Sequence, residues 1–439
     1  MKNTVKNFMF YIAFVASLGG LLFGFDTAVI SGAEKSIQTV YGLSDFSHGF
    51  TIAIALIGTI IGAFICSKPV EKYGRLKALK IIAFLYFVSA VGSAAIIDWY
   101  SFLFFRFAGG LAVGASSVVG PMYIAEISPS RWRGRFVAFF QFNIVLGIVL
   151  AYFSNYWIHG IAHDWQWMLG VEAIPAIVFA LLLYTVPESP RWLVKQNKET
   201  EARRIIKEVS NADIEQEVHE IRESLVATGN CGEKLFQRKY RKPILYAFLI
   251  ATFNQLSGIN AILYYAPRIF EMSGVFTDSA MMQSIVIGLT NLTFTMIGMI
   301  LIDQVGRKKL LYIGSIGMAI SLALVAKGFC QDTFSGYYML ACLMGFIAFF
   351  AISLGAVIWV LISEVFPNSI RSKGQVLGSM THWVWSVLLS WMFPVFIRTG
   401  GTFIFSFFAI MMFLSFFFAL RLPETKNKSL EQIQKELTN

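Results

Sequence analysis

Two residues of opposite charge each lie deep inside an apolar stretch of the sequence. Asp26 interrupts a run that begins near Phe8, and Arg106 interrupts the run FLFFRFAGGLAVGASSVVG. An ionisable side chain at the centre of a membrane helix costs roughly 2.5–3.5 kcal/mol on insertion scales, so it is kept only where it faces protein or an aqueous cavity. Because Arg106 is the only basic residue well inside another apolar run, we expect it to be the partner of Asp26.

The chemistry open to this pair is proton exchange. Burial disfavours the charged form of a carboxyl group, whereas a nearby guanidinium favours it, so a change in the separation of Asp26 and Arg106 would alter the affinity for a proton. For productive coupling, proton and substrate must favour the same conformational transition. The alternative is a structural ion pair that locks two helices together.

The composition indicates that membrane helices position these residues. Of the 439 residues, 56% are hydrophobic and 14% are charged, and the mean hydropathy is +0.64. Soluble domains are about 45–50% apolar and about 25% charged. The net charge of +10 is spread over the loops and forms no single basic face, so we expect no nucleic acid partner.

Continuous apolar runs predict an all-α membrane protein with twelve transmembrane helices. A spanning helix needs about 20 mostly apolar residues, and barrel strands would instead alternate in pieces of about ten. The predicted spans are 8–33, 47–69, 77–97, 100–127, 134–157, 166–186, 243–271, 278–303, 309–329, 335–363, 373–397 and 402–421. The first apolar segment is longer than that of a cleavable signal peptide, so we expect the first helix to stay in the mature protein.

The distribution of basic residues predicts the orientation. With both termini inside, the inner segments hold 31 of the 36 Lys and Arg residues, and the outer segments hold only Lys35, Arg268, Lys327 and Arg398. Basic residues are enriched in cytoplasmic loops. We therefore expect a multi-pass protein of the cell membrane with both termini in the cytoplasm.

Repeated motifs predict a duplicated six-helix unit. Glu126-Ile-Ser-Pro129 recurs as Glu364-Val-Phe-Pro367, and Pro187-Glu188-Ser189 recurs as Pro423-Glu424-Thr425. We expect two pseudo-symmetric bundles with the substrate held between them. The predicted domains are a bundle at 1–186, a cytoplasmic linker with short amphipathic helices at 187–242, a bundle at 243–421 and a cytoplasmic tail at 422–439. A plain solvated linker is the alternative for 187–242.

Eight stretches, in order along the chain, resemble the sugar porter family of the major facilitator superfamily. They are GGLLFGFDTAVISG, RFAGG, GPMYIAEISPSRWRGR, PESPRWL, NQLSGINAILYYAP, DQVGRKK, WVLISEVFPNSIRSK and PETK. The resemblance covers essentially the whole chain, and it is greatest to bacterial proton-coupled xylose, arabinose and galactose carriers, which share an aspartate at the place of Asp26. It implies a secondary transporter.

Amide and aromatic side chains inside the apolar runs predict a sugar site, because hydroxyls need groups that donate and accept, and ring faces need aromatic walls. Interhelical hydrogen bonding is the alternative for a single amide. Gly258 can interrupt its helix and let it bend at the site. His382 stands where the close relatives carry Gln. The predicted contacts, which match those of the family, are Phe23, Gln141, Asn254, Gln255, Asn260, Tyr264, Asn291, Trp359, His382 and Trp383.

Acidic residues at helix ends and arginines of the inner loops predict a conformational latch. A network that exists in only one state biases the equilibrium, even where each pair contributes little. The alternative is a signal for topology alone. The predicted latch residues are Arg75, Glu126, Arg133, Arg307, Glu364 and Arg371.

These observations favour a monosaccharide and proton symporter that works as a monomer, without metal or cofactor. The cysteines Cys66, Cys231, Cys330 and Cys342 have neither paired spacing nor a cluster of histidines nearby. The alternative in the same fold is a facilitative uniporter. A membrane enzyme or a primary pump would need a catalytic or phosphate-binding motif, which the sequence lacks, and a sugar sensor would need a longer cytoplasmic extension.

Overall fold

The computed structural model describes residues 3–128, 132–209, 214–227, 235–331, 336–367, 370–426 and 432. Within these ranges every regular element is helical, and 12 helices are long and apolar enough to cross a membrane. This confirms the predicted fold class. Arg131, Cys231 and most of the predicted tail lie outside the described residues.

Each span overlaps its predicted run, but two ends differ in ways that matter later. The predicted run 243–271 ends as a span at Tyr264. The first spanning helix continues to Val40, beyond the end of the apolar run at Ala33, and the second begins at Asp45. The spans are Asn7–Val40, Asp45–Ile65, Arg75–Ala95, Trp99–Ile127, Arg133–Ile158, Asp164–Leu182, Arg238–Tyr264, Thr277–Val305, Arg307–Gln331, Gly336–Glu364, Arg371–Arg398 and Gly401–Arg421.

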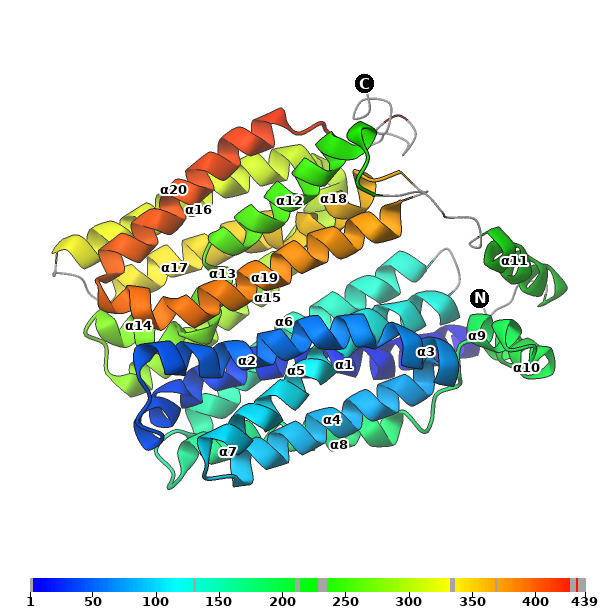
Figure 1. The fold of residues 1–439 in the computed structure, drawn as a ribbon, viewed down its shortest axis with the longest axis horizontal. Coiled ribbons are helices and arrows are strands. Elements are labelled where there is room, and N and C mark those ends of the chain that lie inside the picture. The colour runs from blue at the N-terminus through cyan, green and yellow to red at the C-terminus, as the bar shows by residue number, and fades with distance from the viewer. Residues whose placement is uncertain are drawn as a thin grey trace. The chain divides into compact units, whose positions relative to one another are not determined.

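The elements before residue 232 include several short helices beside the spans (Figure 1). They are α1 (Asn3–Val40), α2 (Asp45–Ile65), α3 (Ser67–Tyr73), α4 (Arg75–Ala95), α5 (Trp99–Ile127), α6 (Arg133–Ile158), α7 (Asp164–Gly170), α8 (Ala173–Leu182), α9 (Pro190–Lys195), α10 (Glu199–Val209) and α11 (Ile214–Ala227). The predicted amphipathic helices of the linker correspond to α10 and α11.

The later elements include one π-helical turn inside a span. They are η2 (Arg238–Tyr240), α12 (Arg241–Leu256), α13 (Ile259–Tyr264), α14 (Ala266–Met272), α15 (Thr277–Val305), α16 (Arg307–Gln331), α17 (Gly336–Phe350), η3 (Ala351–Gly355), α18 (Ala356–Glu364), α19 (Arg371–Arg398) and α20 (Gly401–Arg421). A π-turn often marks a functional position in a helix.

The contacts divide the chain into two compact units. Unit 1 consists of Met1–Val29, Ile54–Ser154 and Gly160–Cys231, and unit 2 consists of Ile30–Ala53, Asn155–His159 and Gly232–Asn439. The segment Ile30–Ala53, which holds the end of α1 and the start of α2, therefore packs with the second half of the chain. The domain boundaries given above stay a prediction.

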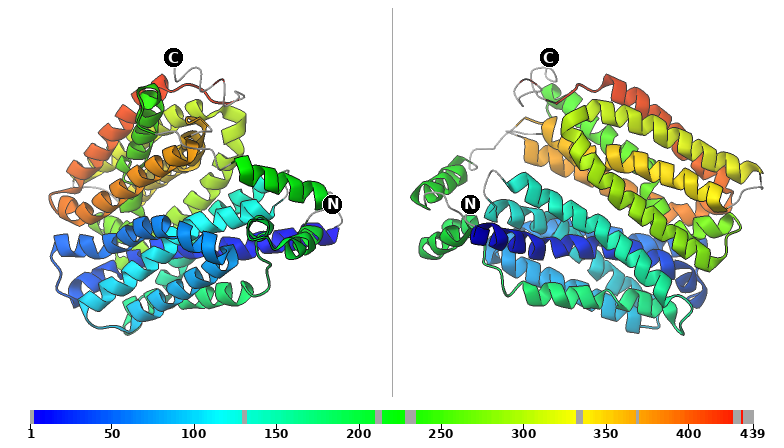
Figure 2. Two further views of the ribbon diagram at one scale, coloured as in Figure 1. Left: turned by 45° about the vertical axis from the view of Figure 1, so that its right-hand side comes forward. Right: turned by 180° about the vertical axis from the view of Figure 1, so that it is seen from behind.

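Each unit has its own apolar packing. In unit 1, α4 packs against α5, α7 and α8, and α9 contacts α5, α10 and α11 (Figures 1 and 2). In unit 2, α16 lies along α20, and α12 lies along α19. Lipid tails are as apolar as the surfaces of these helices, so the hydrophobic effect does not drive the helices together. Close packing and buried polar contacts must therefore hold them in place.

Gly258 breaks the seventh span, as predicted. Its φ of 85° and ψ of 10° place it in the left-handed region, between the end of α12 and the start of α13. A Cβ atom at this position would lie 2.5 Å from the ring of Phe408. Both the backbone conformation and the space therefore require glycine here.

Candidate functional site

The predicted partners Asp26 and Arg106 form an ion pair inside unit 1. Arg106 on α5 donates from Nη1 to Oδ1 of Asp26 on α1 at 2.5 Å. Asp26 is 4% exposed and Arg106 is 3% exposed. The predicted pairing is confirmed, and the pair is shielded from bulk solvent.

A second acidic residue belongs to this site and was missing from the predicted set. Glu172, at the N-cap of α8, is 2% exposed and interacts electrostatically with both Asp26 and Arg106. Its Oε1 atom has no hydrogen-bond partner among the described residues. One guanidinium therefore lies close to two buried carboxyl groups. The two acidic side chains therefore compete for the same guanidinium.

The predicted amides Asn254, Gln255 and Asn260 form a hydrogen-bonded cluster in unit 2. Gln255 donates from Nε2 to Oδ1 of Asn254 at 3.0 Å, and Asn260 donates from Nδ2 to Oε1 of Gln255 at 3.0 Å. Asn260 also donates to Oγ of Ser386 on α19 at 2.5 Å. The break at Gly258 makes this cluster possible, because it brings residues of α12 and α13 to one place.

The outer contacts of the cluster fix its position. Asn254 donates to the backbone oxygen of Leu354 in the π-helical turn η3 at 3.2 Å. The Oδ1 atom of Asn260 is an acceptor, and the two bonds made by Nδ2 fix the orientation of the amide. An acceptor of this kind, held by neighbours on both sides, is suited to bind a hydroxyl group.

Aromatic rings surround His382 next to the cluster. Nε2 of Gln255 lies 3.2 Å from the ring nitrogens of His382, so it can donate to whichever is unprotonated. The rings of Trp359 and Trp383 have centroids 5.0 Å and 5.1 Å from that of His382. Trp359, on α18, is partly exposed. His382 is thus held by an amide and two indole rings.

The hydrogen bonds and ring contacts described for the amide cluster and His382 do not include four other predicted sugar contacts. Tyr264 is buried at the end of α13, and Asn291 accepts from Thr295 within α15 at 3.4 Å. Phe23 on α1 packs against the core of unit 1, and Gln141 is half-buried on α6. Their role in binding stays a prediction.

The predicted latch residues of unit 1 form a bidentate ion pair. Arg75 donates from Nε and Nη2 to the two carboxylate oxygens of Glu126, each at 2.7 Å. Ser189 donates from Oγ to Glu126 at 2.5 Å. Arg133 donates from Nε to the backbone oxygen of Ala125 at 2.9 Å.

The duplicated motifs place a similar group in unit 2. Arg307 donates from Nη2 to Oε1 of Glu364 at 3.2 Å. The Nε and Nη2 atoms of Arg371 are buried and have no hydrogen-bond partner among the described residues. Pairing of Arg371 with Glu364 in another state stays a prediction.

Two further glutamates complete the repeat, and the predicted set omitted them although both lie in repeated motifs. Glu188 accepts from the backbone N–H groups of Arg75 and Leu76 at the start of α4. Glu424 accepts from those of Arg307 and Lys308 at the start of α16. A carboxylate at a helix N-terminus is stabilised by the free N–H groups and the helix dipole.

Burial raises the pKa of Glu188, whereas the N–H groups of Ser189, Leu76 and Arg75 and the Arg75 guanidinium oppose that rise. Desolvation favours the neutral acid, and the hydrogen bonds favour the carboxylate. The two influences make the charge of Glu188 depend on its contacts with α4.

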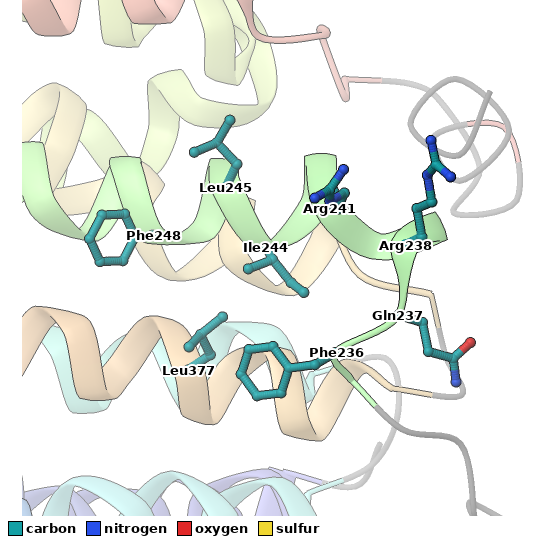
Figure 3. A pocket seen from close by; sticks show the side chains of 8 residues that line it. All are labelled: Phe236, Gln237, Arg238, Arg241, Ile244, Leu245, Phe248 and Leu377. Atoms are coloured by element: carbon teal, nitrogen blue, oxygen red, sulfur yellow. The ribbon is translucent and has the colours of Figure 1, made fainter.

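The cysteines and one cavity are the remaining features of interest among the described residues. Burial raises the pKa of Cys66 to about 11, and Cys342 is also buried, whereas Cys330 is exposed. A cavity of about 900 Å³ lies at the start of α12 (Figure 3). No predicted site residue lines it; the lining residues are Phe236, Gln237, Arg238, Arg241, Ile244, Leu245, Phe248 and Leu377.

Comparisons with known proteins identify similar chains. A family model described as "Sugar (and other) transporter" matches residues 12–437. The chain is 38% identical to the D-xylose-proton symporter of Escherichia coli, over 98% of this chain and 96% of that protein. It is 37% identical to the arabinose-proton symporter of Bacillus subtilis, over 99% of this chain and 96% of that one.

Solved structures give the same result. The inward open conformation of the xylose transporter XylE from E. coli has a TM-score of 0.86 and 37% identity, over 98% of this chain and 99% of that chain. A structure of the same transporter bound to 6-bromo-6-deoxy-D-glucose has a TM-score of 0.80. The resemblance inferred from the sequence motifs is confirmed.

Proposed function

The chain belongs to the family of sugar and other transporters, and from this premise we propose that it imports a monosaccharide together with a proton by alternating access. Membership of a transporter family confirms the prediction that the protein is not an enzyme. The substrate is a pentose or hexose, in keeping with the xylose and arabinose of the relatives' names.

The observation that carries the proposal is the buried pair of Asp26 and Arg106. An ion pair held only for stability would be a costly device inside a membrane helix, because the desolvation of both charges offsets much of their attraction. A titrating site gives a reason for keeping it. The presence of Glu172 beside the pair supports the same function, since it supplies a second carboxyl group that competes for one guanidinium.

Proton binding acts on the site through Arg106. When Asp26 binds a proton, its hydrogen bond with the guanidinium weakens, and Arg106 becomes free to interact with Glu172. Such an exchange gives the site two arrangements that differ by one proton. A ligand shifts a conformational equilibrium by its differential affinity for the two states, so a proton and a sugar that favour the same state are transported together.

The sugar binds to the amide cluster through its hydroxyl groups. Asn260 and Gln255 offer acceptor oxygens that their neighbours hold in place, and the indole rings of Trp359 and Trp383 offer apolar faces. Pockets with a few fixed polar groups and aromatic walls are typical of small-molecule sites. His382 then acts on selectivity, since it bonds to Gln255 and contacts both rings.

The orientation and assembly follow from the same proposal. Twelve candidate spans make this a multi-pass membrane protein. The excess of basic residues on one side supports cytoplasmic termini in the cell membrane. The functional unit is a monomer that needs no nucleic acid partner. The pairs Arg75–Glu126 and Arg307–Glu364 then lie at the cytoplasmic ends of their helices, where they stabilise one conformation more than the other.

Uptake by proteoliposomes tests the proposal. Labelled xylose, arabinose, galactose and glucose are offered with and without an inward proton gradient. We expect the gradient to drive accumulation of at least one sugar. Asp26→Asn keeps the shape of the side chain but cannot titrate, so it should abolish accumulation and leave exchange of sugar largely intact.

Asp278→Asn is the matched control, because the Asp278 side chain is 85% exposed and lies outside the site. It should accumulate sugar as the unaltered protein does. Full accumulation by Asp26→Asn would remove Asp26 from the mechanism. Facilitated exchange without accumulation in the unaltered protein would favour the uniporter.

A further inference from the structure

A second buried group of ionisable residues lies outside both proposed sites, within unit 2. Glu34 on α1 accepts from Nε of Arg268 on α14 at 2.9 Å through Oε1. Its other oxygen, Oε2, lies 2.6 Å from Nε2 of His48 on α2. Glu34 is 1% exposed and His48 is 0% exposed. Three helices therefore meet at one carboxylate that solvent does not reach.

A wider network surrounds this group. Lys35 pairs with Glu271, Gln38 donates to Asp45 at 3.1 Å, and Arg398 donates to Asp45 at 3.0 Å. Arg268 also donates to Gln38. The network joins the segment Ile30–Ala53 to α14 and to the end of α19.

Apolar contacts reinforce the same junction. The ring of Trp391 on α19 lies 5.2 Å from the ring of Phe46 and 5.0 Å from that of Phe50. Its indole donates to the backbone oxygen of Phe46 at 3.1 Å. The segment Ile30–Ala53 is thus held tightly against α14 and α19, in an arrangement that we call the closed junction.

The charges of the closed junction balance without a proton on His48. The acids Glu34, Glu271 and Asp45 face the bases Arg268, Lys35 and Arg398 in three ion pairs. Among the described residues, Tyr265 also lies against the His48 ring, with its ring centroid 6.2 Å away and its hydroxyl donating to the backbone oxygen of Ser390. With a proton on His48, the imidazolium and the Arg268 guanidinium would share the single buried carboxylate of Glu34, which leaves one buried positive charge in excess.

The second ring nitrogen shows why that charge would be poorly tolerated. Nδ1 of His48 is buried and has no hydrogen-bond partner among the described residues. Protonation of the ring would turn Nδ1 into a donor with no acceptor. A buried donor without a partner and a buried excess charge both disfavour the state that contains them. An opened junction, in which water reaches the ring, removes both penalties.

We propose that His48, held by Glu34 and Arg268, is a second proton-binding site, and that its protonation releases the segment Ile30–Ala53 from α14 and α19. With the termini in the cytoplasm, as proposed above, this junction lies at the outer ends of α1 and α2. Acid outside the cell then opens it. Because opening exposes His48 and closing buries it, the proton and the opening are linked whether or not sugar is present.

Spin labels at Val40 and Phe276 can follow the opening. Val40 is 54% exposed at the end of α1, and Phe276 is 87% exposed just beyond α14. Both are replaced by cysteine in a chain whose four native cysteines are replaced by alanine, and distances between the labels are measured in phospholipid nanodiscs without sugar. The pH is varied from about 8 to about 5, the range in which histidine changes charge.

We call the molecules with the longer distance between the two labels the separated population. We expect this population to rise at least about fivefold as the pH falls, because fivefold is the lower limit of typical coupling between two sites. His48→Gln keeps a donor for Glu34 but cannot titrate, so this rise should disappear. His159→Gln is the matched control, because His159 also pairs with an acid, Asp278, whose side chain is 85% exposed. It should keep the rise.

A rise that persists in His48→Gln, or its absence from the unaltered protein, would overturn the inference. Glu34→Gln gives an independent test if His48→Gln does not fold, since it removes the carboxylate at the centre. It should raise the separated population at both ends of the pH range, and behaviour like that of the unaltered protein would also overturn the inference.

This inference and the proposed function fail in different experiments. The distance measurement needs neither sugar nor transport, and the His48-dependent rise should persist in Asp26→Asn. Loss of proton-driven accumulation would therefore leave the His48 site standing. Conversely, the unaltered protein could accumulate sugar normally while the separated population of His48→Gln still rises with acid. That result would refute the His48 site and leave the proposed function standing.

Discussion

Asn260 donates a hydrogen bond of 3.0 Å to Gln255, and this bond spans the break in the helix at Gly258. A continuous helix would point the side chains of residues five positions apart in different directions, so the bond depends on the break. Ser386 holds Asn260 from the other side at 2.5 Å. The polar cluster is therefore a product of the local backbone and of α19 together.

Removal of either amide should weaken sugar binding. An unpaired hydroxyl or buried amide costs about 1–3 kcal/mol, so Gln255→Ala and Asn260→Ala should each raise the Kd roughly 5- to 150-fold. Calorimetry with the transported sugar measures the change. Gln237→Ala, at the cavity near the start of α12, should leave the Kd unchanged. Unaltered binding in both cluster variants would mean that the sugar binds elsewhere.

Gly258→Ala should destabilise the protein and reduce transport. Alanine at a φ of 85° is strained by about 1–2 kcal/mol, and its Cβ atom would lie 2.5 Å from the Phe408 ring. A lower Tm in detergent and a lower rate of uptake are expected. Gly134→Ala is the matched control, since open space surrounds Gly134 on α6. A Tm equal to that of the unaltered protein would show that the break is not needed.

His382→Gln should change the preferred sugar more than the maximal rate. Glutamine can keep the bond to Gln255, but it lacks the ring that contacts Trp359 and Trp383. Competition between sugars for uptake gives the order of preference. An unchanged order across the panel would place His382 outside the site.

Glu172→Gln should impair proton-driven accumulation while sugar exchange continues. The variant keeps the size of the side chain but removes one of the two carboxyl groups beside Arg106. Exchange and accumulation are compared in the same proteoliposomes, with Glu223→Gln on the exposed face of α11 as control. Equal accumulation in both variants would show that Glu172 takes no part in coupling.

Arg371→Gln should slow transport more than it weakens sugar binding. The arginine is the first residue of α19, about three helical turns before His382. Two of its nitrogens have no partner among the described residues, so it is available for a contact in another state. Loss of one charged hydrogen bond in that state corresponds to about a tenfold change in rate. A Kd that rises in proportion to the loss of rate would identify Arg371 as a determinant of folding.

The sequence by itself determined the class of protein and the pairing of Asp26 with Arg106. Apolar runs of about 20 residues leave little freedom, because backbone groups in lipid must bond within one helix. A buried acid must find a base, and only Arg106 lay well inside another apolar run. The same argument applies to Glu172, which lies near the start of the predicted run 166–186, so the signal was present although unused.

Only the tertiary structure decided which polar groups act together. The amides were visible in the sequence, yet Asn254, Gln255 and Asn260 share bonds, whereas Asn291 bonds within its own helix. The sequence could not distinguish these cases, because a bond between helices depends on their rotation and on the break at Gly258. Hydropathy fixes only which residues enter the membrane.

The buried junction of Glu34, His48 and Arg268 is the clearest example of a site that the sequence could not predict. Glu34 follows the end of the predicted run 8–33, and Arg268 lies three residues before the end of the predicted run 243–271, so neither stands deep inside an apolar run. In the structure α1 continues to Val40, and contacts with α2 and α14 bury Glu34. Burial is a property of three-dimensional packing, which no local pattern around Glu34 records.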